Sequence, residues 1–282
     1  MTGFVTRFAP SPTGYLHRGH AYSALTAFEA AREANGRFIL RIEDIDATRC
    51  RPEYEAAIHE DLAWLGLGWE TPVRRQSDHL ADYRRALGAL GERGLLYRCF
   101  RTRREIAWAI ESAPHGRMEA FRGSPLSTEE EARRVAAGEP YAWRLSLATA
   151  EQALGGFGGL TFVEEGHGPD GEQGLIAARP ALGGDVVLAR KDVGVAYHLA
   201  VTVDDALQGV SHVIRGQDLF EATHVQRLLQ ALLGLPTPTY RHHRLLASPD
   251  GQRFAKRDRA ETLRALREDG MAAYDLRAEL GF

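Results

Sequence analysis

The segment from residue 4 to residue 28 constrains the fold more than any other part of this chain. A short apolar run, Phe4 to Phe8, predicts a strand, and two prolines and a glycine then interrupt regular structure. Ala21, Leu25 and Phe28 follow at the spacing of an amphipathic helix. A strand, a glycine-containing turn and a helix N-terminus in this order form an anion-binding layout.

His17 and His20 stand where this helix is expected to begin. Unpaired backbone N–H groups and the positive end of the helix dipole favour an anion there, and two imidazoles add further donors. The alternative is a pair of histidines on a solvated helix face, because short motifs match many unrelated sequences. The Pro-Ser-Pro-Thr-Gly run over residues 10–14 favours a site that stabilises charge on a nucleotide phosphate.

Composition excludes several classes of protein. The chain has 282 residues, 44% of them hydrophobic, which is enough for one large domain or two smaller ones. A net charge of −3 argues against a nonspecific nucleic-acid binder. Two cysteines cannot build a disulfide framework and indicate a reducing compartment. Neither a signal peptide nor a run of about 20 apolar residues is found, so we expect a cytoplasmic protein without a membrane partner.

Strand and helix patterns alternate in two parts of the chain, which is typical of a parallel sheet covered by helices. After the opening strand and helix, the first part predicts a strand at 37–42 and helices at 52–65 and 78–93. The second part predicts strands at 185–190, 195–203, 212–215 and 240–247, and a helix at 220–233. The segment between these two parts lacks the alternation and is interpreted as an insertion. It has frequent glycines, strands expected at 141–147 and 160–163, and four arginines at positions 98, 101, 103 and 104. The expected organisation is a nucleotide-binding domain in two halves (1–95 and 186–247), an inserted subdomain (96–185) and a final segment (248–282).

Two charged segments are candidates for binding substrate. Residues 41–46 follow the second strand, where ligands of open α/β sheets bind, and Glu43 is placed to hold an ammonium. A helix-capping or metal-binding role is the alternative for this segment. Residues 248–258 form a Pro-Asp-Gly turn and a basic loop in which Lys256 can close over a triphosphate. For this loop the alternative is a solvated surface turn.

Two further segments place polar side chains within or directly after an apolar run. Tyr197 and His198 break the apolar run 195–201, and a buried tyrosine with a satisfied hydroxyl is the simpler interpretation. Arg215 follows a predicted strand, where an arginine can bind a carboxylate with two parallel hydrogen bonds. A plain surface arginine is the alternative at that position.

Together, in this order, the segments resemble the class I glutamyl-tRNA synthetases from about residue 3 to about residue 260. Residues 7–20 are similar to the first family signature, which ends in His-x-Gly-His. Residues 41–46 are similar to its Arg-Ile-Glu-Asp-x-Asp stretch, and residues 253–257 resemble its Lys-x-Ser-Lys loop. Tyr197 and Arg215 fall on the tyrosine and the arginine of the family.

The resemblance implies a Rossmann-like α/β nucleotide-binding fold with an inserted α+β acceptor-type subdomain. It implies that His17, His20 and Lys256 are catalytic and that these residues, with Gly19, bind ATP, which acts with Mg²⁺. The residues implied to bind L-glutamate are Arg7, Phe8, Ala9, Pro10, Ser11, Glu43, Tyr197 and Arg215. Among them Glu43 is expected to meet the ammonium, and the two arginines are expected to meet the two carboxylates, without an assignment of each.

The stretch after Lys256 is shorter than the roughly 50 residues of a small domain. We therefore expect a tail of one or two short helices and no anticodon-binding domain. This pattern is similar to truncated family members that activate glutamate with ATP without tRNA and place it on the queuosine base of tRNA(Asp). Three alternatives stay open: a truncated enzyme that charges tRNA(Glu) with a separate anticodon-binding partner, a small-molecule ligase of the same superfamily, and a non-enzymatic tRNA-binding relic. A monomer is expected.

Two departures from the family pattern stand out. The lysine loop reads Arg-Phe-Ala-Lys-Arg over residues 253–257, so its first lysine is an arginine and its serine an alanine, while the positive charge is kept. Many family members bind zinc in the insertion through a Cys-x-Cys pair and a downstream tyrosine and cysteine. Here Cys99 stands alone in that pair and no cysteine follows it, so one thiolate cannot complete a tetrahedral site. We therefore expect no zinc and assign no metal-ligating residue, with Mg²⁺ expected on the phosphates of ATP.

Overall fold

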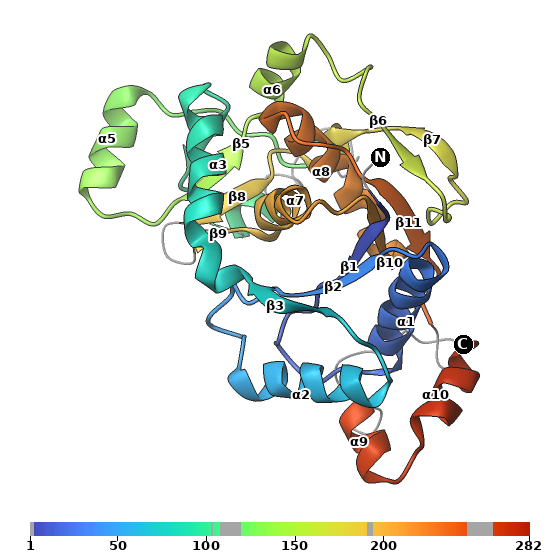
Figure 1. The fold of residues 1–282 in the computed structure, drawn as a ribbon. Coiled ribbons are helices and arrows are strands. Elements are labelled where there is room, and N and C mark those ends of the chain that lie inside the picture. The colour runs from blue at the N-terminus through green and yellow to red at the C-terminus, as the bar shows by residue number, and fades with distance from the viewer. Residues whose placement is uncertain (1–2, 103, 108–119, 191–193, 247–261) are drawn as a thin grey trace.

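Two sheets of mostly parallel strands form the centre of the molecule (Figure 1). The structure is a computed structural model that describes residues 3–102, 104–107, 120–190, 194–246 and 262–282. The first sheet has the order β1 (Val5–Phe8), β2 (Arg37–Ile42), β3 (Glu70–Arg75), with all strands parallel. The second has the order β10 (His212–Gly216), β11 (Thr239–His243), β6 (Thr161–Glu164), β7 (Gly174–Ala177), and only β7 is antiparallel to its neighbour.

The two sheets meet where β1 lies beside β10. The Ser211 N–H donates to the Val5 carbonyl at 3.0 Å, and the Val5 N–H donates to the Ser211 hydroxyl at 2.8 Å. The carboxyl ends of β1, β2, β10 and β11 therefore share one edge, which is where ligands of open α/β sheets bind.

Helices cover both faces of this central layer. The helices of the described residues are α1 (Arg18–Glu33), α2 (Pro52–Trp64), α3 (Leu80–Glu92), α5 (Thr128–Ala136), α6 (Leu147–Leu154), α7 (Tyr197–Leu207), α8 (Phe220–Leu233), α9 (Leu263–Glu268) and α10 (Ala273–Leu280). Short 3₁₀ turns cover Gln76–His79, Pro180–Gly183 and Gln217–Leu219. Figure 1 shows α7 and α8 on one side of β1 and β2, and α1 and α2 on the other.

Alternate residues of the strands supply two separate cores. Ile39 of β2 and Val213 of β10 belong to the core under α3, α7 and α8. Leu40 and Ile214, one position later on each strand, belong to the core under α1 and α2. Because side chains alternate along a strand, this division shows a sheet buried on both faces, as the α/β prediction requires.

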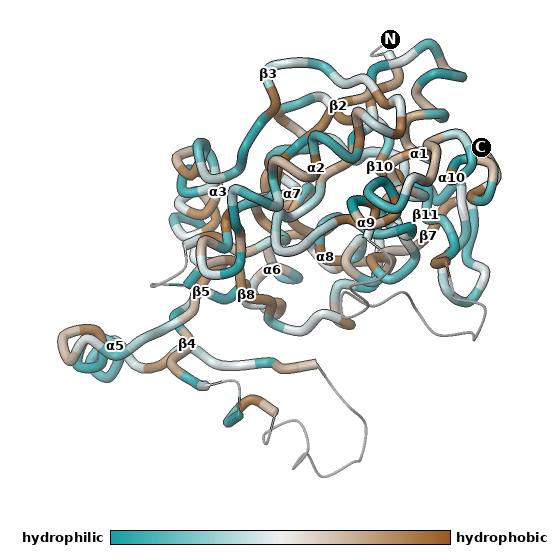
Figure 2. Tube along the Cα trace, turned by 90° about the horizontal axis from the view of Figure 1, so that it is seen from below, coloured by the Kyte–Doolittle hydropathy of each residue, from teal (hydrophilic) through white to brown (hydrophobic). Residues whose placement is uncertain are grey.

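A third sheet stands apart from the central layer. It has the order β4 (Leu96–Cys99), β5 (Ala142–Leu145), β8 (Val187–Arg190), β9 (Gly194–Val195), and all its pairs are antiparallel. Figure 2 shows β4 and α5 extending away from the rest of the fold. The buried Asp185 ties this region together, since its carboxylate accepts from the Tyr97 hydroxyl at 2.8 Å and from the Gly123 and Leu147 N–H groups at 2.8 and 2.9 Å.

The strand expected at 195–203 is wrong. After the two-residue strand β9, helix α7 begins at Tyr197 and runs to Leu207. Seven consecutive residues of this helix, from Leu199 to Asp205, are buried, so the apolar run carries neither the period of a strand nor that of an amphipathic helix. A short apolar run does not distinguish a buried strand from a buried helix. The strand expected at 240–247 also ends early, at His243.

The last two helices, α9 and α10, pack against the core formed by α1 and α2. Leu263 and Leu276 are fully buried there, and the Leu263 N–H donates to the Leu16 carbonyl at 2.8 Å. Ion pairs join Arg277 to Glu29 at 2.6 Å and Arg18 to Glu279. The expected short helical tail is therefore present and anchored to the start of the chain.

Candidate active site

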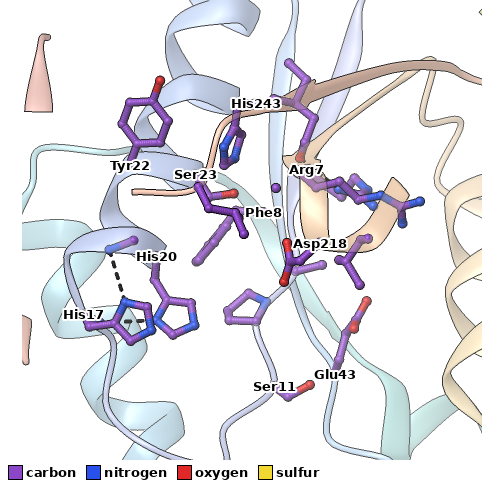
Figure 3. A pocket seen from close by; sticks show the side chains of 18 of the residues that line it. Arg7, Phe8, Ser11, His17, His20, Tyr22, Ser23, Glu43, Asp218 and His243 are labelled. Carbon is purple, nitrogen blue, oxygen red and sulfur yellow. Dashed lines mark hydrogen bonds between the residues drawn. The ribbon is translucent and has the colours of Figure 1, made fainter. Parts of the chain in front are cut away.

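A cavity of about 600 Å³ opens at the carboxyl ends of β1 and β10, beside the first turn of α1 (Figure 3). The predicted site residues that line it are Arg7, Phe8, Ala9, Pro10, Ser11, His17, Gly19, His20, Glu43, Tyr197 and Arg215. Lys256 falls outside the described residues. Within the described part of the chain, the structure thus brings together the predicted residues from four separate segments.

The two histidines form the N-terminal cap of α1. The His17 Nδ1 accepts from the Gly19 N–H at 3.1 Å, and the His20 Nδ1 accepts from the His17 N–H at 3.2 Å. Their ring centroids are 3.8 Å apart. Since each Nδ1 accepts a backbone hydrogen, each neutral ring carries its proton on Nε2, and these N–H groups are donors suited to phosphate oxygens.

Gly19 packs closely against this cap. A Cβ built on Gly19 would lie 3.0 Å from the Cε1 atom of the His17 ring, so the imidazole would have to shift by a few tenths of an ångström to accept a side chain there. The glycine of the His-Arg-Gly-His sequence therefore keeps room for the cap, besides leaving the backbone open to a ligand.

A buried network of opposite charges lies behind Arg7 and Glu43, which line the other end of the cavity. Asp205 of α7 accepts from the Arg7 Nε at 3.1 Å and from Arg41 Nη1 at 2.7 Å. Arg41, which is fully buried, also donates to Glu43 at 3.1 Å. Burial favours the neutral acid at Asp205, but Arg7 and Arg41 outweigh it and lower the pKa of that carboxyl. For Glu43 burial dominates and raises the pKa, against the effect of the two arginines.

The turn after β1 brings Glu43 to the cavity wall. The Glu43 N–H donates to the Pro10 carbonyl at 3.0 Å, which joins the end of β2 to the proline-containing segment. Glu43 is 7% exposed, so its carboxylate reaches the cavity while most of its surface is covered. A buried anion of this kind can meet an ammonium that enters from the cavity.

Arg215 and Tyr197 complete the cavity on the side of β10. The Arg215 Nη1 lies 3.5 Å from the Tyr197 hydroxyl oxygen, and Nη2 donates to the Thr223 hydroxyl at 2.7 Å. Burial raises the pKa of Tyr197, so its hydroxyl keeps its proton and can donate to a carboxylate. Arg7, Arg215, Tyr197 and Glu43 thus present two guanidinium groups, a hydroxyl and a carboxylate to the cavity, a set that suits a ligand with two carboxylates and an ammonium.

A second, smaller cavity of about 260 Å³ adjoins the first. Ser11, Glu43 and Tyr197 line both, and Asp46 and Arg190 line only the second.

Sequence reasoning did not select several residues of the site. Among the described residues, those that also line the larger cavity are Tyr22, Ser23, Ile214, Gly216, Asp218, Leu219, His243, Leu245 and Leu246. Asp205 was missed as a partner of Arg7 and Arg41. The signal available for it was the pair of acids, Asp204 and Asp205, directly after an apolar run.

No group of three or more histidine, cysteine or acidic side chains placed to hold a metal occurs in the part of the chain that the structure describes. Cys99 is buried and Cys50 is partly buried, and both are free thiols. In the same residues, no helix combines the length and the apolar character that crossing a bilayer requires.

The chain matches the family model "tRNA synthetases class I (E and Q), catalytic domain" over residues 4–279. It belongs to this family. The fold class and the resemblance predicted from the sequence are thereby confirmed. The chain is 46% identical to the glutamyl-Q tRNA(Asp) synthetase of Rhodobacter capsulatus, over 98% of its own length and 99% of the relative. It is 42% identical to a protein of the same name from Symbiobacterium thermophilum, over 94% of this chain and 81% of the relative.

Solved structures of family members have the same architecture. A glutamate tRNA ligase from Elizabethkingia meningosepticum, crystallised in complex with its amino acid, superposes with a TM-score of 0.73 at 28% identity. That match covers 90% of this chain and 52% of the ligase, so this class I synthetase spans about half the length of the solved relative.

Proposed function

We propose that the chain activates L-glutamate with ATP, without tRNA, and transfers the glutamate to the queuosine base of tRNA(Asp). The observation that carries this proposal is the cavity in which Arg7, Glu43, Tyr197 and Arg215 lie beside the histidine cap of α1. The two relatives named for this activity match over most of their own length, which supports the same acceptor here.

In the first step, a carboxylate oxygen of glutamate attacks the α-phosphorus of ATP, and pyrophosphate leaves. Negative charge develops on the phosphorus oxygens, and the Nε2–H groups of His17 and His20, together with the N-terminus of α1, stabilise it. Lys256 adds a positive charge in this proposal, and Mg²⁺ is carried in on the phosphates of the substrate. The products are glutamyl-adenylate and pyrophosphate.

In the second step, a hydroxyl of the cyclopentene ring of queuosine attacks the acyl carbonyl. An ester bond forms, the bond to phosphate breaks, AMP leaves and the hydroxyl proton passes to solvent. The smaller cavity, which shares Ser11, Glu43 and Tyr197 with the larger one, gives this hydroxyl a route to the carbonyl.

The proposed amino-acid site also explains selection of glutamate over glutamine. Glu43 would bind the ammonium, and Arg7 and Arg215 would each bind one carboxylate. Glutamine would leave one buried guanidinium without a charged partner, and rejection on such grounds reaches about 10⁴-fold or more. Cytoplasmic location and a monomeric state remain predictions from the sequence.

Two assays test the proposal. Glutamate-dependent exchange of labelled pyrophosphate into ATP, with no RNA present, measures the first step. For the second, labelled glutamate is offered with tRNA(Asp) that contains queuosine, the same tRNA without it, and tRNA(Glu). Mass analysis of the digested nucleosides should find glutamyl-queuosine in tRNA(Asp) that contains queuosine. The same product should form in tRNA(Asp) trimmed of its 3′ adenosine, because the 3′ end is not the proposed acceptor. Label on the 3′ end of tRNA(Glu) would instead identify a truncated glutamyl-tRNA synthetase. Absence of exchange both without RNA and with either tRNA would identify a relic.

A further inference from the structure

Two buried side chains, His242 and Glu164, form a chain of hydrogen bonds that ends on Arg215. Arg215 and His242 are directly paired in the ladder between β10 and β11, and the Arg215 Nε donates to His242 Nε2 at 3.1 Å. The other ring nitrogen, His242 Nδ1, lies 2.6 Å from Glu164 Oε2 on β6. His242 and Glu164 have no exposed side-chain surface.

Their geometry determines the charge of each member. An arginine N–H can only donate, so His242 Nε2 accepts and carries no proton. The single ring proton is therefore on Nδ1, which donates to a Glu164 carboxylate that is ionised. Burial and the neighbouring Arg215 lower the pKa of His242, with Glu164 opposing them, which agrees with a neutral ring.

Glu164 is held in place from its other side as well. Its Oε1 accepts from the His242 N–H at 2.8 Å and from the Gly166 N–H at 2.9 Å. A Cβ built on Gly166 would lie 2.2 Å from the His242 carbonyl oxygen, so only glycine allows this close approach of the two backbones. Glu164 therefore has one fixed orientation relative to β11.

The surroundings of the two cavity arginines differ. Arg7 contacts a carboxylate directly, with 3.1 Å between its Nε and Asp205 Oδ1. Arg215 donates from its three nitrogens to uncharged partners, namely His242, Thr223 and Tyr197. The negative charge of Glu164 reaches Arg215 through a neutral ring, so within the described part of the chain the guanidinium is oriented without a carboxylate in direct contact.

We propose that His242 and Glu164 are positioning residues for Arg215: Glu164 fixes the imidazole tautomer, and the imidazole orients the guanidinium for a carboxylate of the substrate. This inference rests on the proposed function, because it takes glutamate as the ligand. It also gives β6, which lies in the segment predicted as an insertion, a role in the amino-acid site.

Three variants separate this role from a merely structural one, with pyrophosphate exchange as the assay. Glu164→Gln keeps the size of the side chain but presents an N–H or a weaker acceptor to Nδ1. His242→Asn keeps a group near Nδ1 and loses the acceptor for Arg215, whereas His242→Gln keeps an acceptor near Nε2. Glu165→Gln, the same change at the next, exposed residue of the hairpin, is the matched control.

We expect Glu164→Gln and His242→Asn to raise the KM for glutamate about 10- to 100-fold, the effect of losing a hydrogen bond to a charged group. The KM for ATP should stay within about twofold of wild type, because the cap of α1 is untouched. His242→Gln should recover most of the loss, and Glu165→Gln should match wild type. Equal changes in both KM values, or equal effects of the two His242 variants, would overturn the proposal.

The tautomer gives a readout that needs no catalysis. In wild-type protein with ¹⁵N-labelled histidine, long-range proton–nitrogen spectra should show His242 protonated on Nδ1, and the signal is assigned by its loss in His242→Gln or His242→Asn. A ring protonated on Nε2, or on both nitrogens, would refute the inference even where Glu164→Gln does not fold. If wild type shows no glutamate-dependent exchange, the proposed function fails; if wild type is active and Glu164→Gln keeps a normal KM for glutamate, only this inference fails.

Discussion

Replacement of Asp205 by asparagine tests the charge network that supports the amino-acid site. Asp205→Asn keeps the shape of the side chain and removes one negative charge. The carboxylate lies 3.1 Å from Arg7 Nε and 2.7 Å from Arg41 Nη1, and Arg41 has no exposed side-chain surface. The variant therefore leaves two cations, at least one of them fully buried, with less compensating charge.

The magnitude follows from the cost of breaking a buried ion pair, about 3–5 kcal/mol when one partner is removed. Glu43, 3.1 Å from Arg41, and Asp204, 3.7 Å from it, remain and keep the loss toward the lower end of this range. For a chain of 282 residues the loss corresponds to a fall of about 5–8 °C in the Tm.

The loss should also depend on pH. Arg7 and Arg41 lower the pKa of Asp205 in the folded protein despite its burial. A depressed folded-state pKa contributes stability that is present above the unfolded value of about 3.9 and disappears as the pH falls through the folded value. The difference between wild type and Asp205→Asn should therefore be constant above about pH 5 and shrink at lower pH.

Equilibrium unfolding in urea, followed by far-UV circular dichroism at pH 7 and at pH 3.5, measures both effects. Asp269→Asn, an exposed position at the end of α9, is the matched control and should change stability by less than about 0.5 kcal/mol. A loss below about 1 kcal/mol for Asp205→Asn at pH 7 would refute the reasoning, because the remaining carboxylates would then suffice for both arginines.

Three further results are expected. Lys256→Ala should abolish glutamate-dependent pyrophosphate exchange while the protein stays folded, and near-normal exchange would remove Lys256 from the proposed mechanism. Burial raises the pKa of Asp61 to about 6, against the effect of Arg267 at 3.7 Å, so wild-type stability should fall as the pH rises from about 4 to 6. Asp61→Asn should lack this fall and be about 1–3 kcal/mol more stable than wild type in urea unfolding at pH 8. A variant less stable than wild type at that pH would contradict this expectation. Asp185→Asn should lower the free energy of unfolding by about 2–4 kcal/mol, because an amide cannot accept all three hydrogen bonds from Tyr97, Gly123 and Leu147. Limited proteolysis of this variant should cut first within residues 96–190.

Much of the fold could be predicted because local patterns and tertiary packing agree in most elements. The helix at 220–233 and the strand at 37–42 have the predicted bounds. The helix repeats apolar residues at helical spacing, the strand is a short, mostly apolar run, and a glycine stands beside each. Helix α7 is the exception. Its buried residues include Thr202, Asp204 and Asp205, whose polar groups find partners only in the folded chain, so no periodicity marked them.

Eleven of the residues that line the larger cavity could be predicted, but the partners that support them could not. Because the carboxyl ends of parallel strands meet at one edge, the ends of β1, β2 and β10 had to converge, and with them Arg7, Glu43 and Arg215. Asp205 is 164 residues from Arg41, and Glu164 is 78 residues from His242. Neither pairing leaves a local pattern, since a buried acid and a surface acid look alike in a sequence.

These distant partners give the two arginines different roles although the sequence presents them as equivalent. Arg7 has a carboxylate in contact and keeps a charged partner when the cavity is empty. Among the described residues, the hydrogen-bond partners of Arg215 are all uncharged, so an arriving carboxylate supplies a direct counter-charge that this part of the chain does not. A carboxylate bound to Arg215 therefore gains more than the same group bound to Arg7, because it displaces no existing ion pair. It follows that the affinity for glutamate should depend more steeply on the surroundings of Arg215 than on those of Arg7, although both line the same cavity.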